Sequence, residues 1–185
     1  MDAPVANSIA TPRLSLLPLT PALLRAVEGG DLAEVERQLG ARVGKGWEEG
    51  VPAKLRLEQL AADASAQPWL VRAMVALTPR QVVGCVGFHA PPDEDGRVEI
   101  GYDIVRSERR KGYAREGIQA LLDWAWATGR VRTCVASVSP HNAPSLALIH
   151  SFGFRHVGDQ IDEIDGLELV FERRLPLATD LERRC

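Results

Sequence analysis

Residues Arg97–Ala114 read RVEIGYDIVRSERRKGYA, and this stretch decides the fold. Its first half, Arg97–Val105, alternates apolar and polar residues as a strand does. A basic turn follows and ends at Gly112. Tyr113–Ala127 then carries apolar residues at helical spacing. Val131–Val138 is a second apolar strand, so the whole segment predicts a parallel strand–helix–strand crossover.

The remainder of the chain predicts antiparallel strands and further helices. Strands are expected at Arg13–Leu19, Leu70–Leu77, Gln81–Phe88, Phe154–Ile161 and Leu167–Leu175, and helices at Pro21–Glu28, Asp31–Leu39, Lys54–Ala64 and Asn142–Phe152. A single crossover among such elements predicts an α/β (α+β) fold with a mixed, mostly antiparallel sheet of about seven strands flanked by helices. The length predicts one domain over residues 1–185.

Composition excludes several classes of protein. The chain has 185 residues, 45% of them hydrophobic and 25% charged, with a formal net charge of −3. An acidic balance argues against nucleic acid as a general partner. No signal peptide and no membrane span are expected, and we predict a cytoplasmic protein. The three cysteines form no CxxC pair, so neither a disulfide framework nor a metal site is expected, and Cys85 and Cys134 are interpreted as buried small hydrophobes.

The turn Ser107–Ala114 (SERRKGYA) gathers cations where a helix begins. Cations there oppose the helix dipole, which a bound anion would offset. A glycine at Gly112 lets the backbone approach that anion closely. The turn therefore predicts a phosphate or pyrophosphate site. A solvated charged turn, or a scaffold that binds phosphate without catalysis, remains open at this point.

The order of motifs resembles the GNAT superfamily of N-acetyltransferases. Arg109–Ala114 (RRKGYA) matches its R/Q-x-x-G-x-G/A loop, IGYDIV precedes it, and Asn142-Ala143-Pro144-Ser145 and Gly153-Phe154 follow in order and spacing. The similarity covers about residues 13–175. The opening TPRLSLLPLT is similar to the start of the ribosomal-protein N-terminal (alanine/serine) acetyltransferase branch. Arg110 and Arg106 stand where the family often has Gly and Pro.

The resemblance implies an enzyme, an acetyl-CoA-dependent N-acetyltransferase, with acetyl-CoA as cosubstrate and no metal. The pyrophosphate loop would consist of Arg109, Arg110, Lys111, Gly112, Tyr113 and Ala114. Backbone groups of Ile104 and Val105 would pair with the pantetheine arm in a splay between the strands at 97–105 and 131–138. Asn142 would cap the last helix, hold pantetheine, or do both.

Catalytic roles are expected at Glu99 and Ser145. A carboxylate in an otherwise apolar strand suits a general base that faces a cavity, although the alternation also fits a solvated outward side chain. Ile149 stands where the family usually has a tyrosine that acts as the general acid. The resemblance implies that the Ser145 hydroxyl instead donates a hydrogen bond to the leaving thiolate. Ser145 could equally be there because serine is common near the start of a helix. His141 is the spare candidate base or an ordinary loop histidine.

The acceptor is less determined. Acidic segments at Asp93–Asp95 and Asp159–Asp165 would favour a cationic amine, such as a basic peptide N-terminus, or they are ordinary solvated turns. Trp47 either lines the site of the acceptor amine, as an acceptor wall, or is buried in the hydrophobic core, as a core anchor. The prediction is acetyl transfer to a primary amine of a peptide or a small molecule through a ternary complex. The alternative is a non-catalytic acyl-CoA sensor, and the oligomeric state, a homodimer included, is left open.

Overall fold

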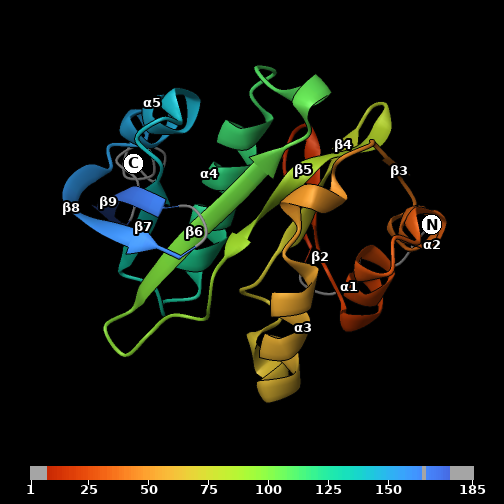
Figure 1. Cartoon of the computed structure of the whole chain (residues 1–185), viewed down its shortest axis with the longest axis horizontal. Coiled ribbons are helices and arrows are strands. Elements are labelled where there is room, and N and C mark those ends of the chain that lie inside the picture. The colour runs from red at the N-terminus through yellow and green to blue at the C-terminus, as the bar shows by residue number, and fades with distance from the viewer. Residues whose placement is uncertain (1–7, 164–165, 176–185) are drawn as a thin grey trace. The chain divides into compact units, whose positions relative to one another are not determined.

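The computed structural model describes residues 8–163 and 166–175 of the chain (Figure 1). These residues form two compact units, each described here by itself. The first unit contains residues 1–91 and 101–121, and the second contains residues 92–100 and 122–185. The chain passes from one to the other between Pro91 and Pro92, again within β6 and again within α4. The single-domain assignment for residues 1–185 stays a prediction.

The strands are β1 (Ile9–Ala10), β2 (Leu14–Pro18), β3 (Arg42–Val43), β4 (Arg72–Leu77), β5 (Arg80–Phe88), β6 (Arg97–Ile104), β7 (Thr133–Val138), β8 (Arg155–Asp162) and β9 (Gly166–Arg174). The α-helices are α1 (Pro21–Glu28), α2 (Leu32–Leu39), α3 (Ala53–Ala62), α4 (Tyr113–Ala127) and α5 (Ala143–Ser151). Short 3₁₀ turns lie at η1 (Glu48–Gly50), η2 (Ala64–Ala66) and η3 (Arg106–Glu108).

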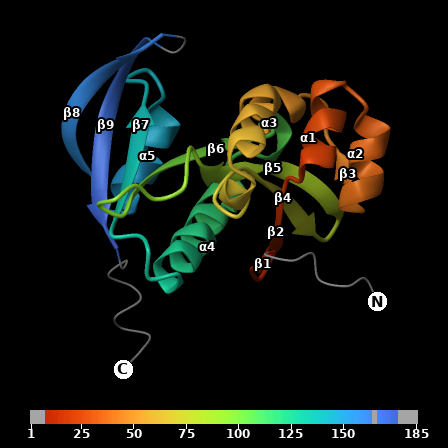
Figure 2. The same ribbon diagram turned by 90° about the horizontal axis from the view of Figure 1, so that it is seen from below.

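The sheet of the first unit has two apolar faces. Strands β1, β2, β4 and β5 are antiparallel neighbours in that order, and β3 lies parallel beside β5. Leu17 pairs with Ala73, and both belong to the buried cluster that includes α1, α2 and α3. Figure 2 shows these three helices on one side of the strands. Leu16 pairs with Met74 and faces the other way, where both lie against Gly117 of α4.

Local chemistry fixes the first two helices of the first unit. Thr20 accepts a hydrogen bond from the Leu23 N–H and Pro21 occupies the first turn, so α1 begins where the sequence predicts. The Asp31 side chain caps α2 in the same way. Gly40 ends α2 with a positive φ of 58°, a conformation that glycine adopts without a side-chain clash.

The second unit is built on the sheet order β6-β7-β9-β8. The start of β6 runs parallel to β7 from Arg97–Thr133 to Glu99–Val135, while β7, β9 and β8 are antiparallel. Backbone pairing between β6 and β7 is confined to the start of each strand. This agrees with the splay expected between these two strands. The ring of Phe171 lies edge-on to His150 of α5, with ring centroids 5.2 Å apart. Helix α5 therefore covers one face of this sheet.

The predicted fold class is confirmed. Seven strands have five residues or more and most pairs are antiparallel, with the crossover strand parallel to its partner. The predictions missed β1 and β3, two strands of two residues each. Such short strands have no periodicity of their own, because only tertiary pairing defines them. No helix in the described ranges is long and apolar enough to span a membrane.

The cysteines are buried as expected. Cys85 and Cys134 are free and buried, and desolvation raises the pKa of the Cys85 thiol to about 12. Burial likewise raises the pKa of the Cys134 thiol. Both are therefore protonated near neutral pH and poor nucleophiles. Cys185 lies outside the described residues.

Candidate functional site

The turn between β6 and α4 has an unusual backbone. Arg110 has a φ of 62° and Gly112 a φ of 85°, and Arg110 is the one non-glycine residue with positive φ in the described chain. The left-handed region suits Gly112, whereas it costs a residue with a Cβ about 1 kcal/mol or more. Left-handed residues in a turn bring neighbouring N–H groups toward one concavity in an anion-binding nest.

The backbone N–H groups of this turn are unsatisfied. From Arg110 to Ala114, none of them donates a hydrogen bond to any described residue. Tyr113 and Ala114 open α4, so their N–H groups have no acceptor within the helix. Arg109, Arg110, Lys111 and Gly112 are all exposed. The turn therefore presents a run of free donors at the positive end of a helix, which is the physical description of a phosphate site.

The charged side chains of the turn are held in different ways. Arg109 donates from Nε to the carbonyl of Ile104 at 2.9 Å and lies 3.4 Å from the Asp103 carboxylate. Lys111 pairs with Glu108 at 2.9 Å. Arg110 makes no ion pair with a described residue. Arg110 is therefore a cation of the turn that is free to bind an outside anion.

The end of β6 differs in part from the expectation. Val105 donates its N–H to the carbonyl of Val83 and accepts from the N–H of Glu108, so both of its backbone groups are used within the unit. Since strand residues alternate, the N–H of Ile104 points away from β5. The N–H of Ile104 can therefore still pair with an extended ligand arm, as predicted, while its carbonyl accepts from Arg109. Val105 is left with side-chain packing against Gly44.

Glu99 lies on β6 in the second unit with a half-buried side chain. Val98 and Ile100 are 3% and 4% exposed, so Glu99 lies on the opposite face, as the alternation predicts. Its carboxylate Oε1 accepts a hydrogen bond of 2.6 Å from the hydroxyl of Ser137 on β7. Ser137 in turn accepts from the Gln160 amide at 3.1 Å. Glu99 is consequently fixed in a polar chain across three strands.

Asn142 and Ser145 stand together at the start of α5. The Asn142 side chain caps the helix by accepting from the Ser145 N–H at 3.2 Å, which confirms the cap that the sequence predicts. The Ser145 hydroxyl bonds to no described residue. Ile149 is fully buried, so its position belongs to the core of the second unit. His141 is exposed, and its N–H lies 3.4 Å from the Ser139 hydroxyl.

Trp47 and Asp93 take structural places in the chain. Trp47 is 1% exposed and donates from its indole to the carbonyl of Gly84 at 3.0 Å, so it is a core anchor. The Asp93 carboxylate accepts from the N–H groups of Asp95 and Arg97 and thereby shapes its own turn. Asp159 pairs with His156 at 2.8 Å on the exposed hairpin. Of the acidic turn Asp159–Asp165, residues 164 and 165 lie outside the described part.

Two residues of the site escaped the sequence analysis. Arg13, just before β2, supports the turn, and Ser137 on β7 holds Glu99. Ser137 gave a signal that could have been used, since it is a polar residue in the apolar run VASV, beside a strand that carries Glu99. Arg13 gave none, because its partner lies 103 residues away. Within the described ranges, no cluster of three His, Cys, Asp or Glu side chains is arranged to hold a metal ion.

The whole arrangement matches a known family. The family model described as Acetyltransferase (GNAT) domain matches residues 13–155, which is most of the chain. The chain belongs to the GNAT acetyltransferase family. That confirms the resemblance drawn from the turn Arg109–Ala114 and its context. Among curated relatives, this GNAT chain is 38% identical over 78 residues to the uncharacterized N-acetyltransferase p20 of Bacillus licheniformis, and the match covers 42% of the chain and 44% of that relative.

Solved structures share the fold of this GNAT chain. The acetyl transferase from Salmonella typhimurium that modifies the N-terminal serine of ribosomal protein L7/L12 has a TM-score of 0.63 at 15% identity, with 91% of this chain and 99% of that one covered. The microcin C7 self immunity acetyltransferase MccE, solved with acetyl-CoA and AMP, has a TM-score of 0.64 at 18% identity over 89% and 94% of the two chains. Identities this low show the fold alone. The assignment to the ribosomal-protein branch stays a prediction.

Proposed function

We propose that this chain transfers the acetyl group of acetyl-CoA to a primary amine. The observation that carries the proposal is the run of unsatisfied backbone N–H groups from Arg110 to Ala114 at the start of α4. Together with family membership, it supports a diphosphate of coenzyme A as the ligand of the turn.

The residues of the turn fit that ligand. A Cβ on Gly112 would stand 3.2 Å from the Arg13 guanidinium and would need a positive φ, so glycine keeps the backbone open there. Arg110 adds a cation with no internal partner. Ile104, with an N–H turned from β5, supplies a backbone donor for the pantetheine arm, and Asn142 is a second polar group for it. Arg109 and Lys111 shape the turn through Asp103 and Glu108.

The proposed chemistry is direct attack. The amine nitrogen bonds to the thioester carbon, the carbon–sulfur bond breaks, and the products are an amide and coenzyme A. The carboxylate of Glu99 takes the proton that the amine loses, directly or through a water. The free hydroxyl of Ser145 donates to the leaving thiolate. The acceptor is a peptide N-terminus or a small amine. A peptide is supported by similar structures whose names record acetylation of ribosomal proteins.

Calorimetric titration with acetyl-CoA tests the cofactor. Gly112→Asp should abolish binding, because it adds bulk and negative charge where the diphosphate must approach. Gly30→Asp is the matched control, since Gly30 also has a positive φ (71°) and lies in open space outside the turn. Loss of binding in both variants, or no binding by the unaltered chain, contradicts the proposal.

Release of coenzyme A with a panel of amines tests catalysis. We expect Glu99→Gln and Ser145→Ala to lower kcat by about 10-fold to 1,000-fold while acetyl-CoA still binds. Glu58→Gln, which alters an exposed carboxylate on α3, serves as the control. Acetyl-CoA binding without coenzyme A release for any amine would instead favour a non-catalytic acyl-CoA sensor.

A further inference from the structure

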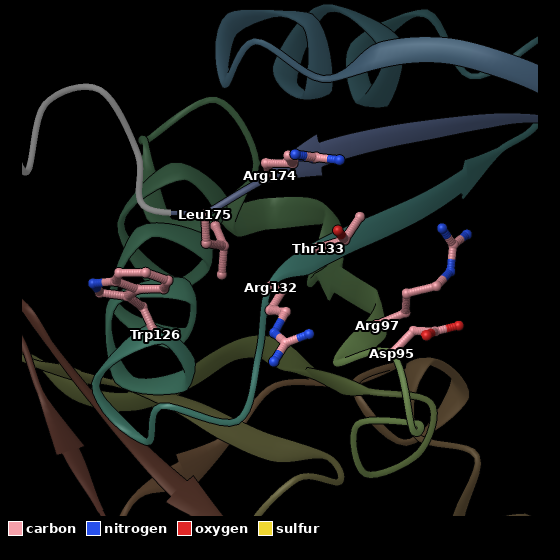
Figure 3. Close-up of a pocket in the computed structure, with 7 residues that line it drawn as sticks. All are labelled: Asp95, Arg97, Trp126, Arg132, Thr133, Arg174 and Leu175. Atoms are coloured by element: carbon pink, nitrogen blue, oxygen red, sulfur yellow. The ribbon is translucent and has the colours of Figure 1, made fainter.

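The second unit contains a cavity of about 620 Å³ that the proposed transfer reaction does not use (Figure 3). Its lining includes Asp95, Arg97, Trp126, Arg132, Thr133 and Arg174. The volume lies within the range of small-ligand sites. None of these residues belongs to the turn Arg109–Ala114, so this cavity is a different place in the molecule.

The lining is basic although the chain is acidic. Three arginines face one aspartate in the cavity, whereas the chain as a whole carries a formal net charge of −3. Arg97 is bound to Glu172 at 2.6 Å. Arg132 and Arg174 are exposed, and neither forms an ion pair with any residue that the structure describes. The cavity thus holds two guanidinium groups without a counter-charge. A bound anion would supply the missing negative charge.

The backbone keeps these groups in place. Arg97 pairs with Thr133 and Thr133 pairs with Arg174, so the three side chains stand side by side on one face of β6, β7 and β9. Arg132 is fixed by its own N–H, which donates to Gly96 at 2.8 Å, and by its carbonyl, which accepts from Leu175 at 3.0 Å. The positive groups are therefore carried by paired strand ends, which suits the binding of a defined ligand.

An aromatic ring completes the lining. Figure 3 shows the indole of Trp126, from α4, on one side of Arg132, with Arg97 and Asp95 on the other. Trp126 is half-buried and leaves part of its ring to the cavity. A flat apolar surface in the same lining as two free guanidinium groups matches a ligand that joins an aromatic ring to phosphate.

We propose that this cavity binds a mononucleotide, with its phosphates on Arg132 and Arg174 and its base against Trp126. The bounded volume and the negative net charge of the chain favour a small nucleotide over a nucleic-acid strand, which needs an extended basic surface. The Thr133 hydroxyl is a further donor for a phosphate or ribose oxygen. The site does not depend on acetyl transfer.

The first test titrates the whole chain with ADP, inorganic phosphate and adenosine, in a background of Gly112→Asp so that the α4 turn does not contribute. We expect ADP to bind with higher affinity than either fragment. Arg132→Gln and Arg174→Gln should each raise the Kd for ADP by about 10-fold or more, because each removes a charge-assisted pair of hydrogen bonds. Arg155→Gln is the matched control, an exposed arginine of the same unit outside the cavity, and should leave the Kd unchanged.

The second test replaces Trp126 by Leu, which keeps an apolar side chain and removes the ring. The Kd for ADP should rise severalfold while that for inorganic phosphate stays the same. Absence of ADP binding, or binding that is insensitive to Arg132 and Arg174, overturns the proposal. Equal affinity for ADP and inorganic phosphate, with no effect of Trp126→Leu, would show an anion site and overturn the assignment to a nucleotide.

Discussion

Arg13 and Glu116, 103 residues apart in the chain, form a hydrogen-bonded ion pair with Nε and Oε2 at 2.6 Å. The same guanidinium donates from Nη1 to the carbonyl of Lys111 at 3.0 Å and lies 5.0 Å from the centroid of the Tyr113 ring. One side chain near the start of β2 thus holds both the turn and the first helical residue after it. Arg13 occupies the Lys111 carbonyl. The N–H groups of the turn remain available to a ligand.

We predict that Arg13→Ala weakens acetyl-CoA binding although Arg13 need not touch the ligand. The contacts of the Arg13 side chain with Lys111, Tyr113 and Glu116 are lost at once. The turn therefore loses preorganisation, and the Kd should rise by about 5-fold to 50-fold. Arg25→Ala, an exposed arginine of α1, should leave the Kd unchanged. Calorimetric titration measures both. An unchanged Kd in Arg13→Ala would mean that the turn holds its shape without this support.

Glu116 should contribute stability that depends on pH. Burial raises the pKa of its carboxyl, but hydrogen bonds from Thr11 and Arg13 outweigh burial and hold the pKa below the ordinary value of 4.5. A depressed pKa stabilises the folded state above that ordinary value, and the stabilisation is lost as the pH falls through the folded pKa. Denaturant unfolding should therefore show Glu116→Gln less stable than the parent at pH 7. The difference should shrink toward pH 3, and a difference that grows in acid would contradict this account.

Arg110→Gly should be tolerated or stabilising. A positive φ of 62° costs an arginine about 1 kcal/mol, which glycine avoids, while the added chain entropy of glycine offsets about 0.5–1 kcal/mol of the gain. Arg106→Gly, in the 3₁₀ turn just before, lacks that gain and should cost about 0.5–1 kcal/mol. Denaturant unfolding compares the two variants. If Arg110→Gly were the less stable of the pair, the left-handed conformation would be absent in solution.

The start of α5 allows stability to be separated from activity. Asn142→Ala removes the helix cap and should lower the free energy of unfolding by about 1 kcal/mol. Ser145→Ala removes a hydroxyl that bonds to no described residue, so its unfolding free energy should stay within about 0.5 kcal/mol of the parent. Thermal and denaturant unfolding check both values. A large loss of stability in Ser145→Ala would point to a structural partner for its hydroxyl.

Sequence patterns predicted the elements that local chemistry controls. Helix α1 begins and ends at the predicted residues because Thr20, Pro21 and Gly29 act on their own neighbours. The α4 turn was recognisable because its cations and Gly112 lie together in the sequence. Burial of Cys85 also follows from residue type. For Trp47, only the structure decided between a core anchor and an acceptor wall.

Long-range contacts were beyond the reach of those patterns. The support from Arg13 and the hydrogen bond from the Val105 N–H to Val83 each depend on segments far apart in the chain. The basic cavity of the second unit has the same origin. Arg97, Arg132 and Arg174 look like scattered surface charges in the sequence, and strand pairing brings them to one lining.

The two units are interleaved along the chain, and this sets an order of assembly during synthesis. Residues 92–100 of the second unit leave the ribosome before residues 101–121, which complete the first. The first unit then has all its parts while most of the second is still being translated, for roughly 3 to 13 seconds at ordinary elongation rates. Until Thr133–Val138 has been synthesised, the opening strand of the second unit has no β7 to pair with. A nascent chain stalled just after residue 121 is therefore the form in which unpaired strand edges would be open to chaperones.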